Sequence, residues 1–440
     1  MSEYRIDNLV ICSTLNQITN YLIIEKYRPK RIFNITYNEE ARGKMNISMK
    51  NEEWDTYLDE EIIGKYKFKN NIEISDSDMY SLTDMEDVFQ EQILDKVGNQ
   101  KIYWHITGGQ RTIALAINDL VNKQERIEDK VMYIEGNTEK LIINKNNGEL
   151  ITGEDSYGCE ELTFRQALRL TGFDTKKLRS TTVLKEERKG KIDEDDKEYK
   201  FYKKLYEIMI TQREKKIEVD KKNKDTLRNL LLKSNRIKNS EGNTERQDLI
   251  KQLFEKTLEE YKSLKEIGYY QNKKDNKDDN EFNKSYPAGY IFEKLTAYKI
   301  YDLIKKNSKI VGMETSLKTY FKDVKENEHN EKNDIIDELD IVLLTDTGKI
   351  INFECKSGGM KGDNAKSHNY TTYRLSGVFG MPILLLPLYN DEASPGFKND
   401  NNILKKPLQA LNAAKAAELE VIAIDRIEKK LKDLRIIEDK

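Results

Sequence analysis

The sequence predicts an α/β protein in which two α/β domains flank a helical connector. Short apolar runs alternate with helical patterns over residues 1–155, the strand pattern ends between residues 156 and 284, and a new alternation begins at Tyr286. Alternating strands and helices are typical of a parallel sheet covered by helices. We therefore expect domains over residues 1–155 and 285–440, with a charged helical connector over residues 156–284.

The N-terminal domain begins with a strand, a helix and a second strand. The run NLVIC (8–12) is a strand candidate, residues 17–27 carry apolar side chains at helical spacing, and RIFNITY (31–37) is rich in β-branched and aromatic residues. A polar stretch follows, for which we expect no element. Together with the later elements this order predicts a Rossmann-like sheet. Those elements are a helix over 79–97, a strand over 101–106, a helix over 110–121 and strands over 131–135 and 140–144.

Charge and cysteine content exclude several classes of protein. The 440 residues include 75 Lys and Arg against 78 Asp and Glu, so a nucleic-acid partner must meet a local basic patch. Cys12, Cys159 and Cys355 form no C-x-x-C pair, which argues against a disulfide framework or a thiolate zinc site. The longest apolar run, residues 381–388, is too short to span a membrane, and the N-terminus has no apolar signal core. We expect a cytoplasmic protein.

The connector carries charged helical patterns with apolar stripes, such as the one between Leu249 and Ile267. The spacing is not a sustained heptad, so packing of helices onto a neighbour is favoured over a coiled coil. Residues 271–284 are almost without apolar side chains and predict an exposed linker.

The C-terminal domain contains a candidate hairpin with two facing carboxylates. A turn centred near Thr347 places Asp340 directly opposite Glu354, and strand alternation puts Glu354 and Lys356 on one face. A carboxylate pair this close can share Mg²⁺ or Mn²⁺, and a neighbouring lysine can orient water or stabilise transition-state charge. The alternative is a solvated face with weak surface ion pairs. Around this hairpin (338–355) we expect helices over 289–306, 364–378 and 404–417, strands over 382–388 and 420–424, and a final helix.

A basic and aromatic patch follows the hairpin. Such a patch can bind a phosphate backbone and stack bases, which fits single-stranded nucleic acid. The alternative is that the tyrosines belong to the core and the lysines to the wet side of a helix. The patch comprises Lys356, Lys361, Lys366, Tyr370, Tyr373 and Arg374, against the one acid Asp363.

The order of a helix with Glu293, then Asp340, then Glu354-Cys355-Lys356 resembles the PD-(D/E)xK restriction-endonuclease-like nuclease core. The resemblance implies that Asp340 and Glu354 are metal ligands, Lys356 is the catalytic lysine and Glu293 is an additional acid. Leu339 stands where the family has a proline.

Two polar loops follow N-terminal strands at the edge where open α/β sheets bind ligands. In Thr107-Gly108-Gly109-Gln110-Arg111-Thr112, two glycines permit close approach of a ligand, and a helix N-terminus attracts phosphate. The other loop, residues 13–17, reads STLNQ and lacks G-x-G-x-x-G, which argues against a nicotinamide cofactor. The alternative is that the two glycines only allow a tight turn and bind no ligand.

The two loops resemble those of the CARF (CRISPR-associated Rossmann fold) sensor domain. A CARF sensor joined to a PD-(D/E)xK nuclease resembles the ancillary nucleases of CRISPR type III antiviral defence. The resemblance implies a homodimer that binds a cyclic oligoadenylate, most often cyclic tetra-adenylate, and a metal-dependent endonuclease that cleaves single-stranded DNA or RNA and nicks duplex DNA. The ring would contact Ser13, Thr14, Asn16, Gln17, Thr107, Gly108, Gly109, Gln110, Arg111 and Thr112.

Other classes of function have less support. The metal-free ribonuclease domains that also occur with CARF sensors need an Arg four to six residues before a His. None of His105, His329 or His368 has an Arg at that distance. The sequence also lacks the G-x-S-x-G nucleophile elbow, so it does not indicate a serine hydrolase. Two alternatives stay open. One is a ligand-sensing dimeric binding module with a non-catalytic nuclease-like platform, and the other is a sensor for a different nucleotide or a linear oligoadenylate.

Overall fold

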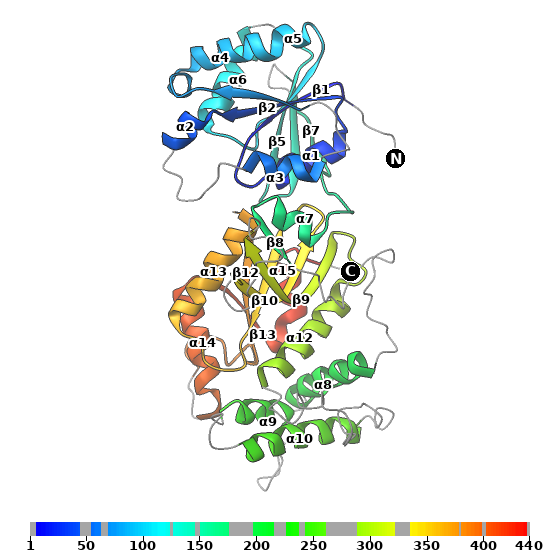
Figure 1. Cartoon of the computed structure of the whole chain (residues 1–440). Coiled ribbons are helices and arrows are strands. Elements are labelled where there is room, and N and C mark those ends of the chain that lie inside the picture. Colours follow the sequence, from blue (N-terminus) through cyan, green and yellow to red (C-terminus); the bar gives the residue numbers. More distant parts are fainter. Residues whose placement is uncertain are drawn as a thin grey trace, which may run out of the picture.

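Two β-sheets, one in each half of the chain, organise the molecule (Figure 1). The N-terminal sheet has seven strands in the order β3-β2-β1-β4-β5-β6-β7, and the C-terminal sheet has six in the order β13-β12-β11-β10-β9-β8. The computed structural model describes residues 6–44, 54–62, 69–123, 126–145, 150–175, 197–214, 226–236, 243–260, 288–321, 335–377, 380–397 and 402–437.

The N-terminal sheet is Rossmann-like, as predicted. Its first strand, β1, lies between β2 and β4 and is parallel to both, so the carboxyl ends of β1 and β4 meet at the topological switch point. Strand β6 runs antiparallel to both of its neighbours, β5 and β7. The strands are β1 (Asn8–Cys12), β2 (Arg31–Tyr37), β3 (Lys69–Ile74), β4 (Ile102–His105), β5 (Lys130–Glu135), β6 (Lys140–Lys145) and β7 (Leu150–Asp155).

Helices cover both faces of this sheet. Leu9 and Ile11 pack with α1 (Ile18–Tyr27) and α3 (Trp54–Ile62), whereas Val10 and Cys12 face α4 (Leu82–Phe89) and α6 (Arg111–Lys123). The helix predicted over 79–97 is α4 followed by a π-helical turn, Gln90–Leu94, and α5 (Asp95–Val97). The polar stretch after β2 was expected to lack elements, but it forms α2 (Glu39–Lys44), α3 and β3. Strand β7 was also missed.

The C-terminal sheet contains the predicted hairpin and two strands that the sequence did not predict. Strand β9 (Ile310–Phe321) pairs antiparallel with β10 (Asp337–Thr345), and β8 (Phe173–Thr175) pairs antiparallel with β9. Strand β8 comes from residues 156–284, where the sequence showed no strand pattern, and the Phe173 ring packs 5.7 Å from that of Phe321. The other strands are β11 (Ile350–Cys355), β12 (Met381–Leu386) and β13 (Glu420–Ala423).

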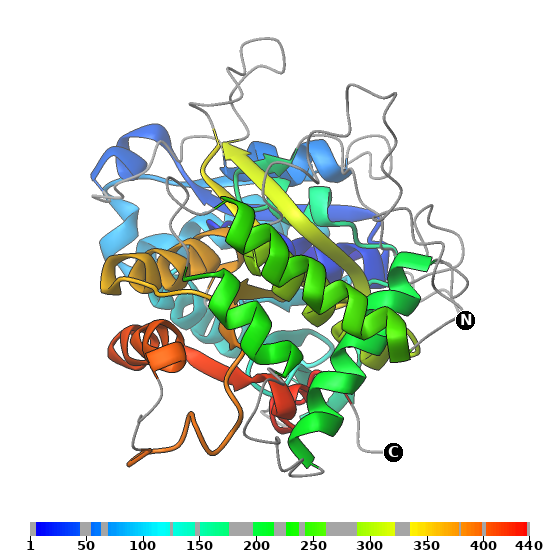
Figure 2. The same cartoon turned by 90° about the horizontal axis from the view of Figure 1, so that it is seen from below.

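Helices of the connector pack on the C-terminal domain, at the end farthest from the N-terminal sheet (Figures 1 and 2). Phe201 stacks on Phe254 with ring centroids 4.8 Å apart, and both join one core with Phe292. This packing confirms helix-on-helix packing for the described part of the stripe; residues 271–284 lie outside the described residues. The described helices of the connector are α7 (Phe164–Arg169), α8 (Lys197–Glu214), α9 (Leu227–Ser234) and α10 (Asn243–Glu260). Those of the C-terminal domain are α12 (Ala288–Ile304), α13 (Gly362–Ser376), α14 (Lys405–Ala416) and α15 (Ile427–Asp433).

One hydrophobic core runs between the two sheets. Ile18 of α1, Phe164 of α7 and Leu344 of β10 belong to the same buried cluster. The N-terminal and C-terminal halves are therefore packed against each other, with α7 and β8 between them (Figure 1). No helix in the described ranges combines the length and apolar content that a membrane crossing needs.

Candidate functional site

The hairpin has the register that the sequence predicted, as far as the pair of Ile341 and Phe353. Ile341 pairs with Phe353 and Val342 with Asn352, so the next position along the two strands brings Asp340 opposite Glu354. The Asp340 Oδ2 atom also accepts a hydrogen bond of 2.8 Å from the Cys355 backbone N–H. Phe353 and Cys355 are buried in the core, as strand alternation predicted. The two carboxylates therefore project from adjacent strands.

A third carboxylate joins this pair from α12. Glu293 Oε1 accepts a hydrogen bond of 3.1 Å from Ser316 Oγ. Burial raises the pKa of Glu293 to about 6, with Glu338 and Glu354 acting in the same direction and Ser316 and Lys294 opposing it. Burial raises the pKa of Asp340 to about 7, with Glu354 and Glu293 acting in the same direction and the Cys355 N–H and Lys356 opposing it. The neighbouring carboxylates thus disfavour the charged forms of Glu293 and Asp340.

Lys356 provides the cation beside the acids. Its ammonium forms an ion pair with Glu354. Burial alone would lower the pKa of Lys356, but the Glu354 and Asp340 carboxylates outweigh burial, so the pKa lies above its usual value. The ammonium is therefore charged at neutral pH, as the predicted role requires.

The donor set fits a hard divalent cation better than a soft one. Carboxylate oxygens are the ligands that Mg²⁺ and Mn²⁺ prefer, and a cation relieves the mutual repulsion of the acids. Within the described ranges, no three His, Cys, Asp or Glu side chains are grouped closely enough to bind a metal on their own. Asp340 and Glu354 would therefore share the ion with water, as Mg²⁺ sites commonly do.

Two residues near the site were not predicted. Asp337 of β10 has a pKa raised by burial, with Glu354 adding to the effect. His368 of α13 is buried, and its Nδ1 lies 3.8 Å from Glu354 Oε2. The three histidines lack the arginine spacing of a metal-free ribonuclease and were interpreted as packing or surface residues. The i to i+4 spacing of His368 and Thr372, both facing β11, is the signal that could have placed His368 here.

The tyrosines of α13 are on the surface, so the alternative in which they belong to the core is wrong. Tyr370 is 66% exposed and Tyr373 is 45% exposed, and Lys361 and Lys366 are exposed as well. The Arg374 guanidinium instead lies 5.8 Å from the centroid of the Phe173 ring. Lys366, Tyr370 and Tyr373 are three or four residues apart and so share one face of the helix.

The two predicted sensor loops lie against each other at the end of β1 and β4. A Cβ at Gly108 would lie 2.5 Å from the Cys12 carbonyl oxygen and 3.1 Å from Thr14 Cγ2. Gly109 has φ +82°, and a Cβ there would lie 2.8 Å from the Cys12 Cβ. Both glycines are thus required by the contact between the loops.

The predicted ring contacts differ in exposure. Gly109, Gln110 and Arg111 are exposed, and Thr14 and Thr112 are half-buried. Gly108 is buried, and Thr107 Oγ1 accepts a hydrogen bond of 2.8 Å from the Ile134 backbone N–H. The open side of the site is therefore formed mainly by Thr14 and residues 109–112.

The remaining predicted contacts are bound within the protein. Ser13 Oγ donates to Asp55 Oδ1 at 2.6 Å, and Gln17 Nε2 donates to the same oxygen at 3.4 Å. Asp55 also accepts hydrogen bonds from Asn34 and Thr36. Asn16 Nδ2 donates to the Ser376 carbonyl at 3.1 Å. Asp55 was not predicted as part of this site, because α3 was not predicted.

Two solved structures match this arrangement over nearly the whole chain. Can2 from Sulfobacillus thermosulfidooxidans, solved in complex with cyclic tetra-adenylate, is 14% identical, with a TM-score of 0.58 over 97% of this chain and 99% of that one. Protein VC1899 from Vibrio cholerae is 13% identical, with a TM-score of 0.62 over 99% of this chain and 98% of that one.

The chain shares the fold of Can2. At this identity the likeness to Can2 shows the fold alone. It confirms the predicted class of a mixed α/β chain, with a Rossmann-like sheet first and a second α/β sheet last. No protein-family model and no curated protein matches the sequence.

Proposed function

We propose that this chain is a metal-dependent endonuclease of CRISPR type III antiviral defence, activated by cyclic tetra-adenylate and active in the cytoplasm. The observation that carries the proposal is the convergence of Asp340, Glu354 and Lys356 at the predicted hairpin register, in a chain whose other end has the fold of a ring-bound protein. A sensor and a nuclease in one chain link recognition of a signal to cleavage.

The nuclease half supplies the residues for phosphodiester hydrolysis. Asp340 and Glu354 would bind Mn²⁺ or Mg²⁺, which when bound lowers the pKa of a coordinated water and stabilises charge on a phosphoryl oxygen. The Lys356 ammonium is placed to stabilise negative charge that develops on the phosphate. Glu293, whose pKa of about 6 is near neutral, is the additional acid and can accept or release a proton there.

The exposed tyrosines of α13 indicate a single-stranded substrate. Tyr370 and Tyr373 share an exposed helix face with Lys366, and the opposite face of the same helix contacts the strand that carries Glu354. Aromatic rings stack on bases whatever the sequence, and lysines bind the backbone phosphates. This surface would bind single-stranded DNA or RNA, and locally unpaired duplex DNA would be nicked in the same way.

The sensor half would bind the ring as a homodimer. Can2 was solved with cyclic tetra-adenylate, and the edge of this chain where β1 and β4 end presents Thr14, Gly109, Gln110 and Arg111. Backbone N–H groups at the start of α6 and the Arg111 guanidinium suit the phosphates. Two such edges across a two-fold axis would enclose a ring that itself has repeated units.

A metal titration against a labelled strand tests the proposal. An endonuclease cleaves the strand when Mn²⁺ and the ring are both present, whereas a non-catalytic platform binds the strand at every metal concentration without cleaving it. Thermal shifts with cyclic tetra-adenylate, a linear oligoadenylate and other nucleotides identify the activator, because a ligand that binds the folded state raises its stability.

A further inference from the structure

The C-terminal turn of α13 is bound by side chains from the N-terminal side of the molecule. The Thr171 hydroxyl, just after α7, lies 2.8 Å from the Leu168 carbonyl and 3.0 Å from the Leu375 carbonyl, so these two acceptors share its one hydrogen. Asn16 Nδ2 donates to the Ser376 carbonyl at 3.1 Å. The last four carbonyls of a helix have no partner within the helix. Two of them therefore obtain partners from outside α13, one of these from the sensor loop.

The contact between Asn16 and α13 leaves no space for a further side chain. Gly377, directly after the helix, has φ +68°, which favours glycine. A Cβ at this position would lie 2.6 Å from Asn16 Nδ2. The sensor loop thus packs directly on the end of α13.

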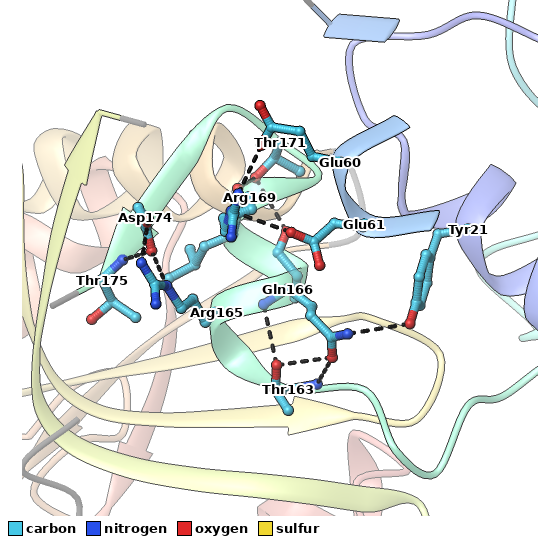
Figure 3. Close-up of polar contacts among 12 residues, drawn as sticks. Tyr21, Glu60, Glu61, Thr163, Arg165, Gln166, Arg169, Thr171, Asp174 and Thr175 are labelled. Carbon is cyan, nitrogen blue, oxygen red and sulfur yellow. Dashed lines mark hydrogen bonds and ion pairs between the residues drawn. The ribbon is translucent and has the colours of Figure 1, made fainter. Parts of the chain in front are cut away.

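Thr171 and Asn16 belong to one hydrogen-bonded unit that includes the predicted ring site. The Gln17 backbone N–H donates to the Leu170 carbonyl at 3.0 Å. On the other side of α7, Arg169 forms ion pairs with Glu60 at 2.7 Å and Glu61 at 3.2 Å, both on α3 (Figure 3).

Helix α3 completes this unit, because its Asp55 accepts hydrogen bonds from Ser13 and Gln17. A displacement of the loop at residues 13–17 would therefore move the end of α7 with it.

The opposite face of α13 contacts the strand that carries Glu354. Ser376 Oγ accepts a hydrogen bond of 3.0 Å from the Ile350 backbone N–H, and Asn352 Nδ2 donates to Thr372 Oγ1 at 2.9 Å. His368 lies 3.8 Å from the Glu354 carboxylate. One helix thus touches both the sensor unit and the nuclease site.

We propose that Asn16 and Thr171 are positioning residues that couple the ring site to Glu354 through α13. The proposal rests on the proposed function, since it concerns how the ring activates the nuclease. A ligand shifts an equilibrium only when it binds two arrangements with different affinity. Here the ring would alter the loop at residues 13–17, and the two hydrogen bonds would pass that change to α13 and so to β11.

Thr171→Val is the decisive variant, because it removes the hydroxyl donor and keeps the shape of the side chain. Thr175→Val is its matched control: Thr175 of β8 is similarly buried, and its Oγ1 donates at 2.9 Å to the Lys318 carbonyl of β9, so this bond does not involve α13. The measurement is the ratio of kcat for strand cleavage with and without cyclic tetra-adenylate, together with the Kd for the ring, KM for the strand and Tm.

We expect Thr171→Val to bind the ring as tightly as wild type and to keep its KM, while the activation ratio falls by about fivefold or more, as is typical of allosteric coupling. Thr175→Val should lower Tm by a similar amount and keep the wild-type activation ratio. Thr171→Ser, which keeps the hydroxyl, should have the wild-type activation ratio. Asn16→Asp keeps the acceptor for the Ile18 N–H but loses the donor to the Ser376 carbonyl, so it should also lower the activation ratio. This variant tests the proposal if Thr171→Val does not fold.

The outcomes separate this inference from the proposed function. A wild type that the ring does not activate overturns both. A wild type that is activated, with Thr171→Val and Asn16→Asp keeping its activation ratio, overturns the inference alone. A ratio that falls equally in Thr175→Val also overturns it, because the effect would then follow from lower stability.

Discussion

The Asp340 carboxylate accepts a hydrogen bond of 2.8 Å from the backbone N–H of Cys355. Cys355 lies between Glu354 and Lys356, so this bond holds the Asp340 carboxylate against the backbone that carries both side chains. A carboxylate oxygen that accepts one hydrogen bond can still bind a cation. The buried Cys355 side chain anchors the strand on its other face. The acids and the lysine are thus positioned by the backbone before any metal or substrate binds.

Replacing Asp340 by Asn should abolish cleavage while the strand still binds. The variant keeps the shape but loses the charge that attracts a divalent ion. Loss of groups that only support metal ligands typically costs 10- to 100-fold, so we expect a loss of at least about 100-fold in kcat. Asp433→Asn, which removes an exposed acid of the same domain, is the control. Cleavage by Asp340→Asn at the control's rate would contradict the assignment.

Removing the exposed tyrosines of α13 should weaken substrate binding. Stacking of a base on an aromatic ring contributes about 1–3 kcal/mol, so Tyr370→Ala and Tyr373→Ala should each raise KM about fivefold or more, with kcat little changed. Tyr80→Ala removes a tyrosine that is 76% exposed on the N-terminal domain and should leave KM unchanged. Equal KM values for all three variants would exclude this helix face as the strand-binding surface.

Asp55 should stabilise both the N-terminal domain and its ring site. Its carboxylate accepts hydrogen bonds from Ser13, Asn34 and Thr36. An unsatisfied buried donor costs about 1–3 kcal/mol, so Asp55→Asn should lower the free energy of unfolding by at least that amount and weaken ring binding. Asp87→Asn, an exposed acid of α4, should change neither. Urea unfolding and ring titration measure the two effects, and unaltered ring affinity would show that Asp55 does not shape the loop.

His105 should make stability depend on pH. Burial lowers its pKa to about 3, from the ordinary value of 6.5. Its Nδ1 lies 3.0 Å from Asn20 Oδ1, which suits a neutral ring. Below pH 6.5 the unfolded chain gains a proton that the native state does not, so stability is complete above pH 6.5 and falls toward pH 3.

The expected loss from His105 is about 1.4 kcal/mol per pH unit. His105→Gln, which does not titrate, should therefore lose less stability than wild type between neutral and mildly acidic pH. Unfolding by urea at several pH values checks this, and parallel stability curves for the two proteins would contradict it.

The hairpin that carries Asp340 and Glu354 could be predicted because its determinants are local. Turn residues near Thr347 fix the register, and strand alternation then places Asp340, Glu354 and Lys356 without further information. Strand β9 was missed because its pattern is interrupted by Gly312 and by Ser316, which has φ +52°. The three-residue β8 is too short to show a pattern, and it exists through its pairing with β9.

The environment of the two loops at residues 13–17 and 107–112 could not be predicted from local sequence. Ser13 and Gln17 are polar residues after a strand, which indicated ligand contact, but Asp55 in an unpredicted helix binds both. Asn16 contacts Ser376, which lies 360 positions away in the sequence. Neither contact can be predicted from residue spacing or composition, because both depend on how elements distant in the sequence pack together.

The most direct test of the account is cleavage of labelled single-stranded DNA and RNA with Mn²⁺, with and without cyclic tetra-adenylate, by wild type and Glu354→Ala. The account predicts cleavage by wild type that needs both the metal and the ring and is absent in Glu354→Ala. A thermal shift of wild type with the ring, but no cleavage of either strand under any condition, would contradict it and favour a ring-binding module with a non-catalytic platform.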